Sequence, residues 1–387
     1  MSNDHSHSAW KSEKLFFDGD DYFNSALEAI DKAQKEIFLE SYIFDLDPIG
    51  QRFLDHLHAA GQRGVQVRLL VDGIGSFNWI HALRNSTAKM KIPFRVYHPL
   101  PFHWGRLKNM SWRRLRQWLF LFRRINKRNH RKVILVDGEK AYMGSFNISQ
   151  VHSQEFMGEK AWRDTGVVLE GAAVGFLKKA YIDAWSKSRF GNQVDTHNFL
   201  RTKVRNYSQS LIRLNSKMRW RFLLLRDLKR RMQSAQKRIL ITNAYFLPRK
   251  AVLRSIRKAS RRGLFVGLCI PAKSDVWFVK LATRSLYFRL LNEGVHIFEY
   301  EPSVLHAKTL IIDDWATVGS HNLNHRSLAH DLEAEAVIQN PENIQRLIEK
   351  WDEDVSRSQS ITLHDLGKMS LIQRIISRIV YWFRYWI

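Results

Sequence analysis

Apolar positions along the chain follow two alternating spacings. Where they recur every three or four residues, the spacing predicts an amphipathic helix; where four to eight run together, it predicts a buried strand. Proline and glycine mark where several segments begin or end. In the first hundred residues the pattern predicts a helix at 20–34, a strand at 37–44, a helix from Pro48 to about Ala60 that Gly61 ends, a strand at 65–71, a helix near 79–84 and a strand at 94–97.

The second part of the chain repeats this order. Strands that alternate with helices favour a parallel sheet, and one long repeat indicates two similar halves instead of a solenoid. The second copy predicts a strand at 238–246, a helix at 249–261, a strand at 262–270, a helix at 276–291 and a strand at 295–300.

The 387 residues, 45% of them hydrophobic, are enough for two ordinary domains or for one pseudo-dimer of two halves. We expect the following division: a polar N-terminal tail at 1–15, a first half at 16–193 with an insert at 102–128, a linker at 194–215, a second half at 216–360 and an amphipathic C-terminal helix at 361–387.

Each half carries the same short motif. It consists of a histidine, a lysine two residues later, an aspartate five residues after the lysine, and then Gly-Ser-x-Asn. Side chains two apart on a strand share a face, so each histidine emerges beside its lysine. The first copy comprises His130, Lys132, Asp137, Ser145 and Asn147, and the second comprises His306, Lys308, Asp313, Ser320 and Asn322.

These residue types suit the chemistry of a phosphodiester. An imidazole is a nucleophile or a proton shuttle near neutral pH, and lysine and asparagine donate hydrogen bonds to phosphoryl oxygens. Two copies that face one another would let one histidine attack phosphorus while the other protonates the leaving alcohol. One copy alone would favour a solvated strand edge, but two copies with matching tails favour catalysis.

The doubled motif resembles the signature of the phospholipase D superfamily. The chain around it, from about residue 16 to about 340, resembles bacterial cardiolipin synthases that lack N-terminal transmembrane helices. The stretches that carry this resemblance further are 39–45, 47–50, 63–72 and 305–310. The expected fold is α/β: two similar α-β-α sandwich halves, each a mixed, mainly parallel sheet flanked by helices, which form a pseudo-dimer with one shared active site.

The resemblance also implies a covalent phosphatidyl–histidine intermediate and neither a metal nor another cofactor. The first-half histidine of the family is usually the nucleophile and the second-half histidine the general acid, which assigns these roles to His130 and His306. Asp164 and Glu333 match the acidic residues that orient the histidines. Asp137 and Asp313 belong to the catalytic signature, although their positions suggest that they close a turn.

Two positions depart from the family pattern. Asn243 stands where threonine is more usual, and a bulky His321 separates Ser320 from Asn322. Neither change removes a catalytic group, so we expect both to alter substrate fit.

The net charge of +25 implies a polyanionic partner, either nucleic acid or an anionic membrane. The first half carries 23 extra residues before its motif, within a basic and aromatic tract that no acidic residue interrupts. We expect this tract to contact a membrane, because its apolar part at 118–122 is unsuited to water. The contact residues expected there are Trp104, Trp112, Trp118, Phe120, Phe122, Arg123 and Arg124.

Two further segments are candidates for membrane contact. The basic segment 217–237 carries a possible apolar stripe, for which packing on the core is an equal alternative. The C-terminal segment, with Trp382, Phe383 and Trp386, predicts an interfacial helix, and docking on the core competes with that interpretation. No secretory signal or spanning segment is evident, and the lone Cys269 fits a reducing cytosol. We therefore expect a peripheral protein on the cytoplasmic side of the cell membrane.

The leading hypothesis is a phosphatidyltransferase that acts on phosphatidylglycerol or phosphatidylethanolamine. Hydrolysis to phosphatidic acid uses the same motif and stays open. A phosphodiesterase acting on nucleic acid is less favoured because of the apolar insert. A non-catalytic basic membrane-binding protein is also less favoured, since both motifs are intact. No obligate protein partner is evident.

Overall fold

The computed structural model describes residues 9–99, 127–188 and 210–368. The elements of the first half are β1 (Ser12–Phe16), α1 (Gly19–Lys32), β2 (Glu36–Ser41), α2 (Pro48–Gln62), β3 (Gln66–Asp72), η2 (Phe77–Trp79), α3 (Ile80–Lys89), β4 (Phe94–Tyr97), β5 (Val133–Val136), β6 (Lys140–Gly144), η3 (Gln150–His152), α5 (Gln154–Met157), η4 (Gly158–Lys160), β7 (Gly166–Glu170) and α6 (Val174–Lys187).

The second half follows the same plan with one extra strand, β15, at an edge of its sheet. Its elements are β8 (Ile212–Leu214), α7 (Met218–Ser234), β9 (Arg238–Asn243), α8 (Lys250–Arg261), β10 (Phe265–Pro271), α9 (Trp277–Leu291), β11 (His296–Tyr300), β12 (Lys308–Ile312), β13 (Trp315–Gly319), α10 (His325–Ala329), β14 (Ala334–Ile338), α11 (Pro341–Ser356), β15 (Ser358–Ile361) and α12 (Leu363–Gly367).

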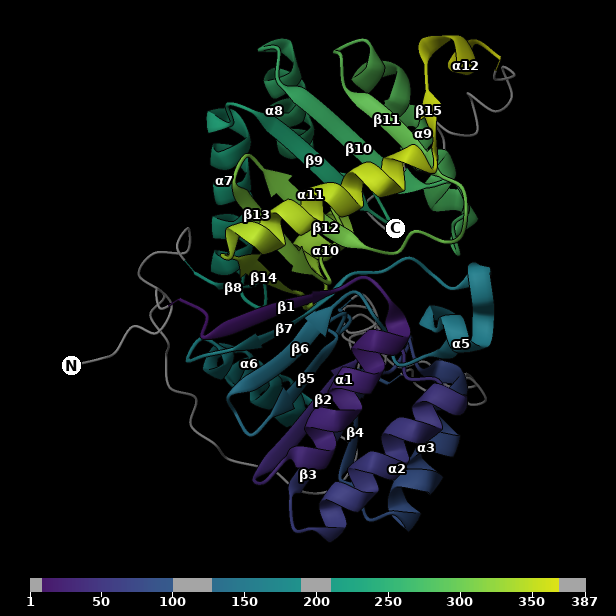
Figure 1. Ribbon diagram of the computed structural model, residues 1–387, viewed down its shortest axis with the longest axis vertical. Helices are drawn as coiled ribbons and strands as arrows, with labels where there is room; N and C mark the ends of the chain where they lie inside the picture. The colour runs from purple at the N-terminus through teal and green to yellow at the C-terminus, as the bar shows by residue number, and fades with distance from the viewer. Residues whose placement is uncertain (1–8, 100–126, 189–209, 369–387) are drawn as a thin grey trace, which may run out of the picture.

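The sequence repeat corresponds to a repeat of the sheet. The first sheet has the order β1-β7-β6-β5-β2-β3-β4, and the second has the order β15-β11-β10-β9-β12-β13-β14-β8. Strands β7-β6-β5-β2-β3-β4 therefore match β14-β13-β12-β9-β10-β11. Figure 1 shows the two sheets one above the other, each with helices on both faces. This arrangement confirms the expected pair of mixed sheets flanked by helices.

The expectation that each sheet is mainly parallel was wrong. The β-α-β units give parallel pairing along β2-β3-β4 and β9-β10-β11, as predicted. The other strand pairings in the described residues are antiparallel. For two of these pairings the cause lies in the motif: a short turn joins β5 to β6 and β12 to β13, and strands joined by a tight turn run in opposite directions.

Local sequence explains where the helices begin and end. Asp18 caps α1 by accepting from the N–H groups of Asp20 and Asp21, and Asp47 caps α2 ahead of Pro48. Gly61 does not end α2, contrary to the sequence prediction. The chain instead reverses at Gly64, which has φ +88°, and the second half repeats this at Gly263, with φ +86°. Only glycine adopts this left-handed conformation without strain.

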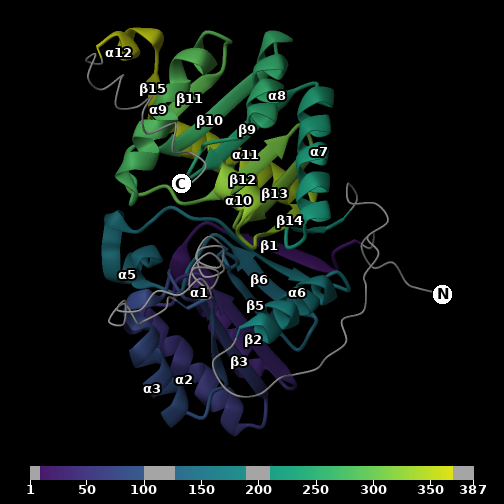
Figure 2. The ribbon, with the colours of Figure 1, turned by 180° about the vertical axis from the view of Figure 1, so that it is seen from behind.

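The two halves share a hydrophobic core. One apolar cluster lies under α1, α2 and α3, and another lies under α7, α8 and α9. A third cluster is continuous across both halves and includes Leu177 and Tyr181 of α6 and Leu347 and Trp351 of α11. Helix α11 crosses the second sheet on the side seen in Figure 1, whereas α6 covers the first sheet on the side seen in Figure 2. The core therefore joins the halves into one unit.

Polar contacts reinforce this junction. Arg163 of the first half pairs with Asp354 of α11, with Nη2 2.8 Å from Oδ2 and Nε 3.0 Å from Oδ1. Near the N-terminus, Glu13 accepts from the backbone N–H groups of Gln339 and Asn340 at 3.0 and 2.8 Å. In the described part of the chain, no helix combines the length and the apolar content needed to cross a membrane.

Candidate active site

Both motif histidines lie where the two halves meet. Each precedes a central strand of its sheet, His130 before β5 and His306 before β12. The backbone N–H of His130 donates to the carbonyl of Leu332 at 2.9 Å, and that of His306 donates to the carbonyl of Arg163 at 2.9 Å. Each histidine is thus held by backbone of the opposite half.

The carboxylates also cross between the halves. His130 Nδ1 lies 3.1 Å from Oε2 of Glu333, and His306 Nδ1 lies 3.1 Å from both oxygens of Asp164. An ionised carboxylate can only accept, so Nδ1–H is the donor in both pairs. This fixes the tautomer and leaves Nε2 of each imidazole for chemistry. Asp164 and Glu333, which the family resemblance suggested as orienting residues, therefore each lie beside the histidine of the other half.

Burial sets the charge state of the site. Burial lowers the pKa of both His130 and His306 to about 4, although the paired carboxylates act to raise it. Burial alone would raise the pKa of Glu333, but His130 and its other neighbours bring it to about 2. Both imidazoles are therefore neutral at pH 7 in this structure. A bound phosphodiester anion would raise their pKa and favour protonation when substrate arrives.

The two lysines share one electrostatic environment. Burial, together with repulsion from Lys308, lowers the pKa of Lys132 to about 7, and burial lowers that of Lys308 to about 8. Each Nζ donates to the carbonyl oxygen of its own motif histidine, Lys132 at 2.9 Å. Two ammonium groups held this way create a site that an anion would stabilise.

The motif serines and asparagines have distinct contacts. Ser320 Oγ donates to Glu333, whereas Ser145 Oγ donates to the carbonyl of Thr165 at 3.1 Å. Asn147 Oδ1 accepts from the N–H of Ile43 at 3.2 Å. Asn322 Oδ1 is buried with no hydrogen-bond partner among the described residues. The serines therefore hold the framework, and the asparagines remain candidates for phosphoryl contacts.

The structure does not bring the two motif aspartates into this cluster. Asp137 and Asp313 follow β5 and β12, at the ends of these strands away from the histidines. Asp137 accepts from the N–H groups of residues 34–36, and Asp313 from those of residues 236–238. These backbone donors help to lower the pKa of both carboxyls, although partial burial acts to raise it. Both aspartates fix the chain ahead of a neighbouring strand.

The two departures from the family pattern contact each other. Asn243 Nδ2 approaches the carbonyl of His321 at 3.5 Å, and Asn243 Oδ1 accepts from the N–H of Leu323 at 3.1 Å. The His321 side chain is buried and its Nδ1 lies 3.1 Å from Glu335. These residues therefore shape the backbone beside Asn322.

Sequence reasoning missed three side chains of the site. Tyr42 lies against the His130 ring, with 4.7 Å between the ring centroids. Lys132 Nζ lies over the Tyr42 ring, 5.2 Å from its centroid. Tyr245 lies 6.4 Å from the His306 ring. His152 is buried next to Asp164, at 2.8 Å from Nδ1 to Oδ2. Both tyrosines lie within strands that the sequence predicted, where they were recognisable only as parts of apolar runs, and in the structure they follow the ends of β2 and β9. His152 belongs to no repeated pattern.

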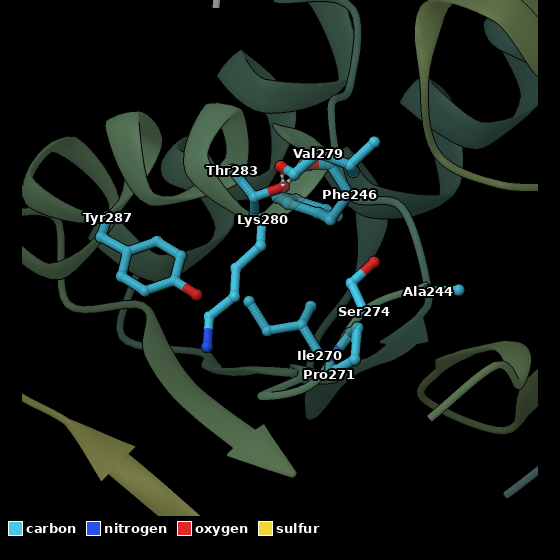
Figure 3. A pocket seen from close by; sticks show the side chains of 9 residues that line it. All are labelled: Ala244, Phe246, Ile270, Pro271, Ser274, Val279, Lys280, Thr283 and Tyr287. Carbon is cyan, nitrogen blue, oxygen red and sulfur yellow. Dashed lines mark hydrogen bonds between the residues drawn. The ribbon is translucent and has the colours of Figure 1, made fainter. Parts of the chain in front are cut away.

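Other candidates lie elsewhere. The predicted membrane contacts Trp104, Trp112, Trp118, Phe120, Phe122, Arg123, Arg124, Trp382, Phe383 and Trp386 fall outside the described residues. Figure 3 shows a separate pocket whose lining contains no motif residue. Its lysine, Lys280, is already paired with Glu299 at 3.4 Å. Among the described residues, no group of three or more His, Cys, Asp or Glu is arranged to hold a metal ion.

Comparison with known proteins gives a consistent picture. The family model described as "Cardiolipin synthase, PLD-like domain" matches residues 26–155 and 228–355. Cardiolipin synthase B of Shigella flexneri is 32% identical over 328 residues, which cover 84% of this chain and 76% of that protein. Cardiolipin synthase of Clostridium perfringens is 30% identical over 379 residues, 95% of this chain and 75% of that protein.

Solved structures show the same fold at lower identity. Phosphatidylserine synthase of Haemophilus influenzae superposes with a TM-score of 0.65 at 14% identity, over 96% of this chain and 92% of that one. Polyphosphate kinase of Porphyromonas gingivalis gives a TM-score of 0.56 at 14% identity, over 89% of this chain and 50% of that one.

Proposed function

The chain belongs to the cardiolipin synthase family with phospholipase D-like domains and is a phosphatidyltransferase, and we propose that its reaction runs through His130 and His306 with phospholipids as donor and acceptor. One observation carries this assignment. Two buried imidazoles, each oriented by a carboxylate of the opposite half, lie in the same electrostatic environment as two lysines.

In the first half-reaction, Nε2 of His130 attacks the phosphorus of a phosphatidylglycerol donor. The bond from phosphorus to the glycerol oxygen breaks, and protonated His306 gives its Nε2 proton to that oxygen. The products are free glycerol and a phosphatidyl group bound to His130. Glu333 supports this step by holding the His130 tautomer and by stabilising the positive charge that develops on the ring.

In the second half-reaction, neutral His306 removes the proton of a hydroxyl on a second phosphatidylglycerol. The hydroxyl oxygen attacks phosphorus, the bond from phosphorus to His130 breaks, and cardiolipin leaves. Lys132, Lys308, Asn147 and Asn322 donate to the phosphoryl oxygens in both steps. Water in place of the second lipid would yield phosphatidic acid.

Lipid mass spectrometry tests this function. Purified protein is incubated with phosphatidylglycerol vesicles, with and without phosphatidylethanolamine, beside His130→Ala. His58→Ala is the matched control, because His58 is a half-buried histidine that contacts Met90 far from the motifs. We expect cardiolipin and glycerol from the wild type and the control only, and ethanolamine release would identify a second donor. Phosphatidic acid alone would make the protein a hydrolase, and no lipid product would refute the proposal.

A peripheral position on the cytoplasmic leaflet agrees with the charge of the chain and with helix α7. The predicted apolar stripe of this helix divides in two: Leu228 and Met232 are buried, whereas Met218 and Phe222 are 79% and 63% exposed. Exposed Arg219 and other cations flank them. Apolar side chains among cations suit the boundary of an anionic bilayer.

Vesicle co-sedimentation tests the role of α7. The double variant Met218→Ser/Phe222→Ser should bind phosphatidylglycerol vesicles several-fold more weakly, with unchanged thermal stability. Phe288→Ser is the matched control, since Phe288 is 66% exposed on a different helix, α9. If the double variant bound the vesicles as strongly as the Phe288→Ser control, α7 would be excluded as the membrane contact.

A further inference from the structure

His152 is enclosed beside the general-acid pair. It ends η3, its side chain is fully buried, and its ring lies 5.6 Å from Phe146, 5.6 Å from Trp162 and 6.0 Å from His306. Its backbone is equally confined, because a Cβ on Gly19 would come within 2.0 Å of the His152 carbonyl oxygen. The imidazole therefore has a fixed place in the fold and little room to turn.

Hydrogen bonding fixes the protonation of this ring. The backbone N–H of Asn147 approaches His152 Nε2 at 3.2 Å, and since a backbone N–H can only donate, Nε2 carries no proton. The single ring proton is then on Nδ1, which lies 2.8 Å from Oδ2 of Asp164. Nδ1 and Oδ2 are close, but they are not aligned for a full hydrogen bond. Catalytic hydrogen bonds are often poorly aligned before substrate binds. Asp164 thus faces two imidazole N–H groups, from His152 and His306.

A comparison of the two halves shows why the second imidazole is needed. In the second half, Ser320 Oγ accepts from the N–H of Ala334 and also donates to Glu333. In the first half, Ser145 makes the equivalent backbone contacts with Thr165, and no hydrogen bond joins it to Asp164 in the described structure. Aspartate is one methylene shorter than glutamate. His152 therefore supplies to Asp164 the donor that Ser320 supplies to Glu333.

We propose that His152 is a positioning residue that holds the Asp164 carboxylate in the orientation that directs His306. It does not touch the substrate. Because it also bonds the Asn147 backbone, it couples the acid–base pair to a group that contacts the phosphoryl oxygens. The electrostatics agree: burial acts to raise the pKa of Asp164, but His306 and His152 hold that pKa well below its usual range. This inference rests on the proposed function, since it assigns His306 the proton transfers.

Two substitutions separate positioning from packing. His152→Phe keeps the ring volume and removes both polar contacts, whereas His152→Asn keeps an N–H donor near the Nδ1 position. We expect His152→Phe to lower kcat for cardiolipin formation about 10- to 100-fold, the range typical of partners that orient a reacting group, with KM nearly unchanged. His152→Asn should recover most of this loss. A second substrate, phosphatidyl-p-nitrophenol, has a leaving group that needs no proton. Both variants should therefore lower the release of p-nitrophenol in the first turnover much less than they lower cardiolipin formation.

The outcomes distinguish the possible failures. If His152→Phe and His152→Asn lowered the rates of cardiolipin formation and of p-nitrophenol release by the same factor, His152 would be a packing residue. Wild-type rates in His152→Phe would also overturn the inference. A wild type that forms no cardiolipin and releases no p-nitrophenol would instead refute the proposed function. If His152→Phe does not fold, selective ¹⁵N-histidine labelling of the wild type decides: a proton on Nε2 of His152 would contradict the inference.

Discussion

The buried Lys132 should lower the stability of the fold at pH 7, although we expect catalysis to need it. Its pKa falls from 10.5 to about 7, and with ~1.4 kcal/mol for each tenfold change this corresponds to roughly 4 kcal/mol of electrostatic cost at pH 7. Two contacts offset part of it: the hydrogen bond to the His130 carbonyl and the Tyr42 ring, each about 1 kcal/mol. Lys132→Met should therefore stabilise the fold by about 2 kcal/mol at pH 7.

The sign of the pH dependence follows from the lowered pKa. The folded state binds fewer protons than the unfolded state between pH 7 and 10.5, so the cost is complete below pH 7 and fades as the pH rises to 10.5. At pH 9.5 only about 1 kcal/mol of the electrostatic cost remains. This is less than the free energy of the two Lys132 contacts that the methionine variant lacks. The advantage of the methionine variant should therefore vanish or reverse at that pH.

Urea unfolding at pH 7 and pH 9.5 measures this effect. Lys178→Met is the matched control, because Lys178 is partly exposed beside Glu36 and should give no such pH-dependent gain. The same Lys132→Met protein should lose about 10²- to 10³-fold in activity, as expected when a donor to a charged oxygen is removed. A variant that is less stable than the wild type at pH 7, or whose stability difference is the same at both pH values, would refute the reasoning.

Two further predictions concern the acidic residues. Glu333→Gln should lower kcat by roughly 10³- to 10⁴-fold, because His130 loses the anionic acceptor that fixes its tautomer. In the same lipid assay, the control Glu335→Gln should lower kcat by less than about tenfold. Similar falls in kcat for the two variants would contradict the pairing of His130 with Glu333. Asp313→Ala should lower the free energy of unfolding by about 2–3 kcal/mol, since three backbone donors lose an anionic acceptor, and Asp313→Asn should lose less. Both Asp313 variants should keep the kcat of the folded enzyme, and a large fall in kcat at unchanged stability would show a catalytic role.

The sequence predicted those features that depend on local pattern. The period of the apolar residues located the β-α-β units of each half, and the doubled motif located His130, Lys132, His306 and Lys308. These features are readable because a strand places residues two apart on one face, whatever surrounds it. The resemblance to a known family added Asp164 and Glu333, whose spacing alone does not connect them to the histidines.

Features that depend on long-range packing were beyond the sequence. The crossed pairing of His130 with Glu333 arises where the two halves meet, 203 positions apart along the chain. The apolar stripe of α7 gave no sign that Leu228 would be buried while Phe222 stayed exposed, because helical spacing does not reveal where a neighbouring helix ends. His152 carries no periodic signal, and its role comes from the tertiary position of Asp164.

The proposed covalent intermediate on His130 offers the most direct test of the mechanism. The substrate is phosphatidyl-p-nitrophenol in vesicles, mixed rapidly with His306→Ala. The first step needs no general acid with this leaving group, whereas the second step needs His306 as a base. We predict a burst of about one p-nitrophenol per protein, followed by slow turnover, with a phosphatidyl adduct that peptide mass spectrometry maps to His130. No burst from His306→Ala, or a burst from His130→Ala with the adduct on His306, would contradict the account.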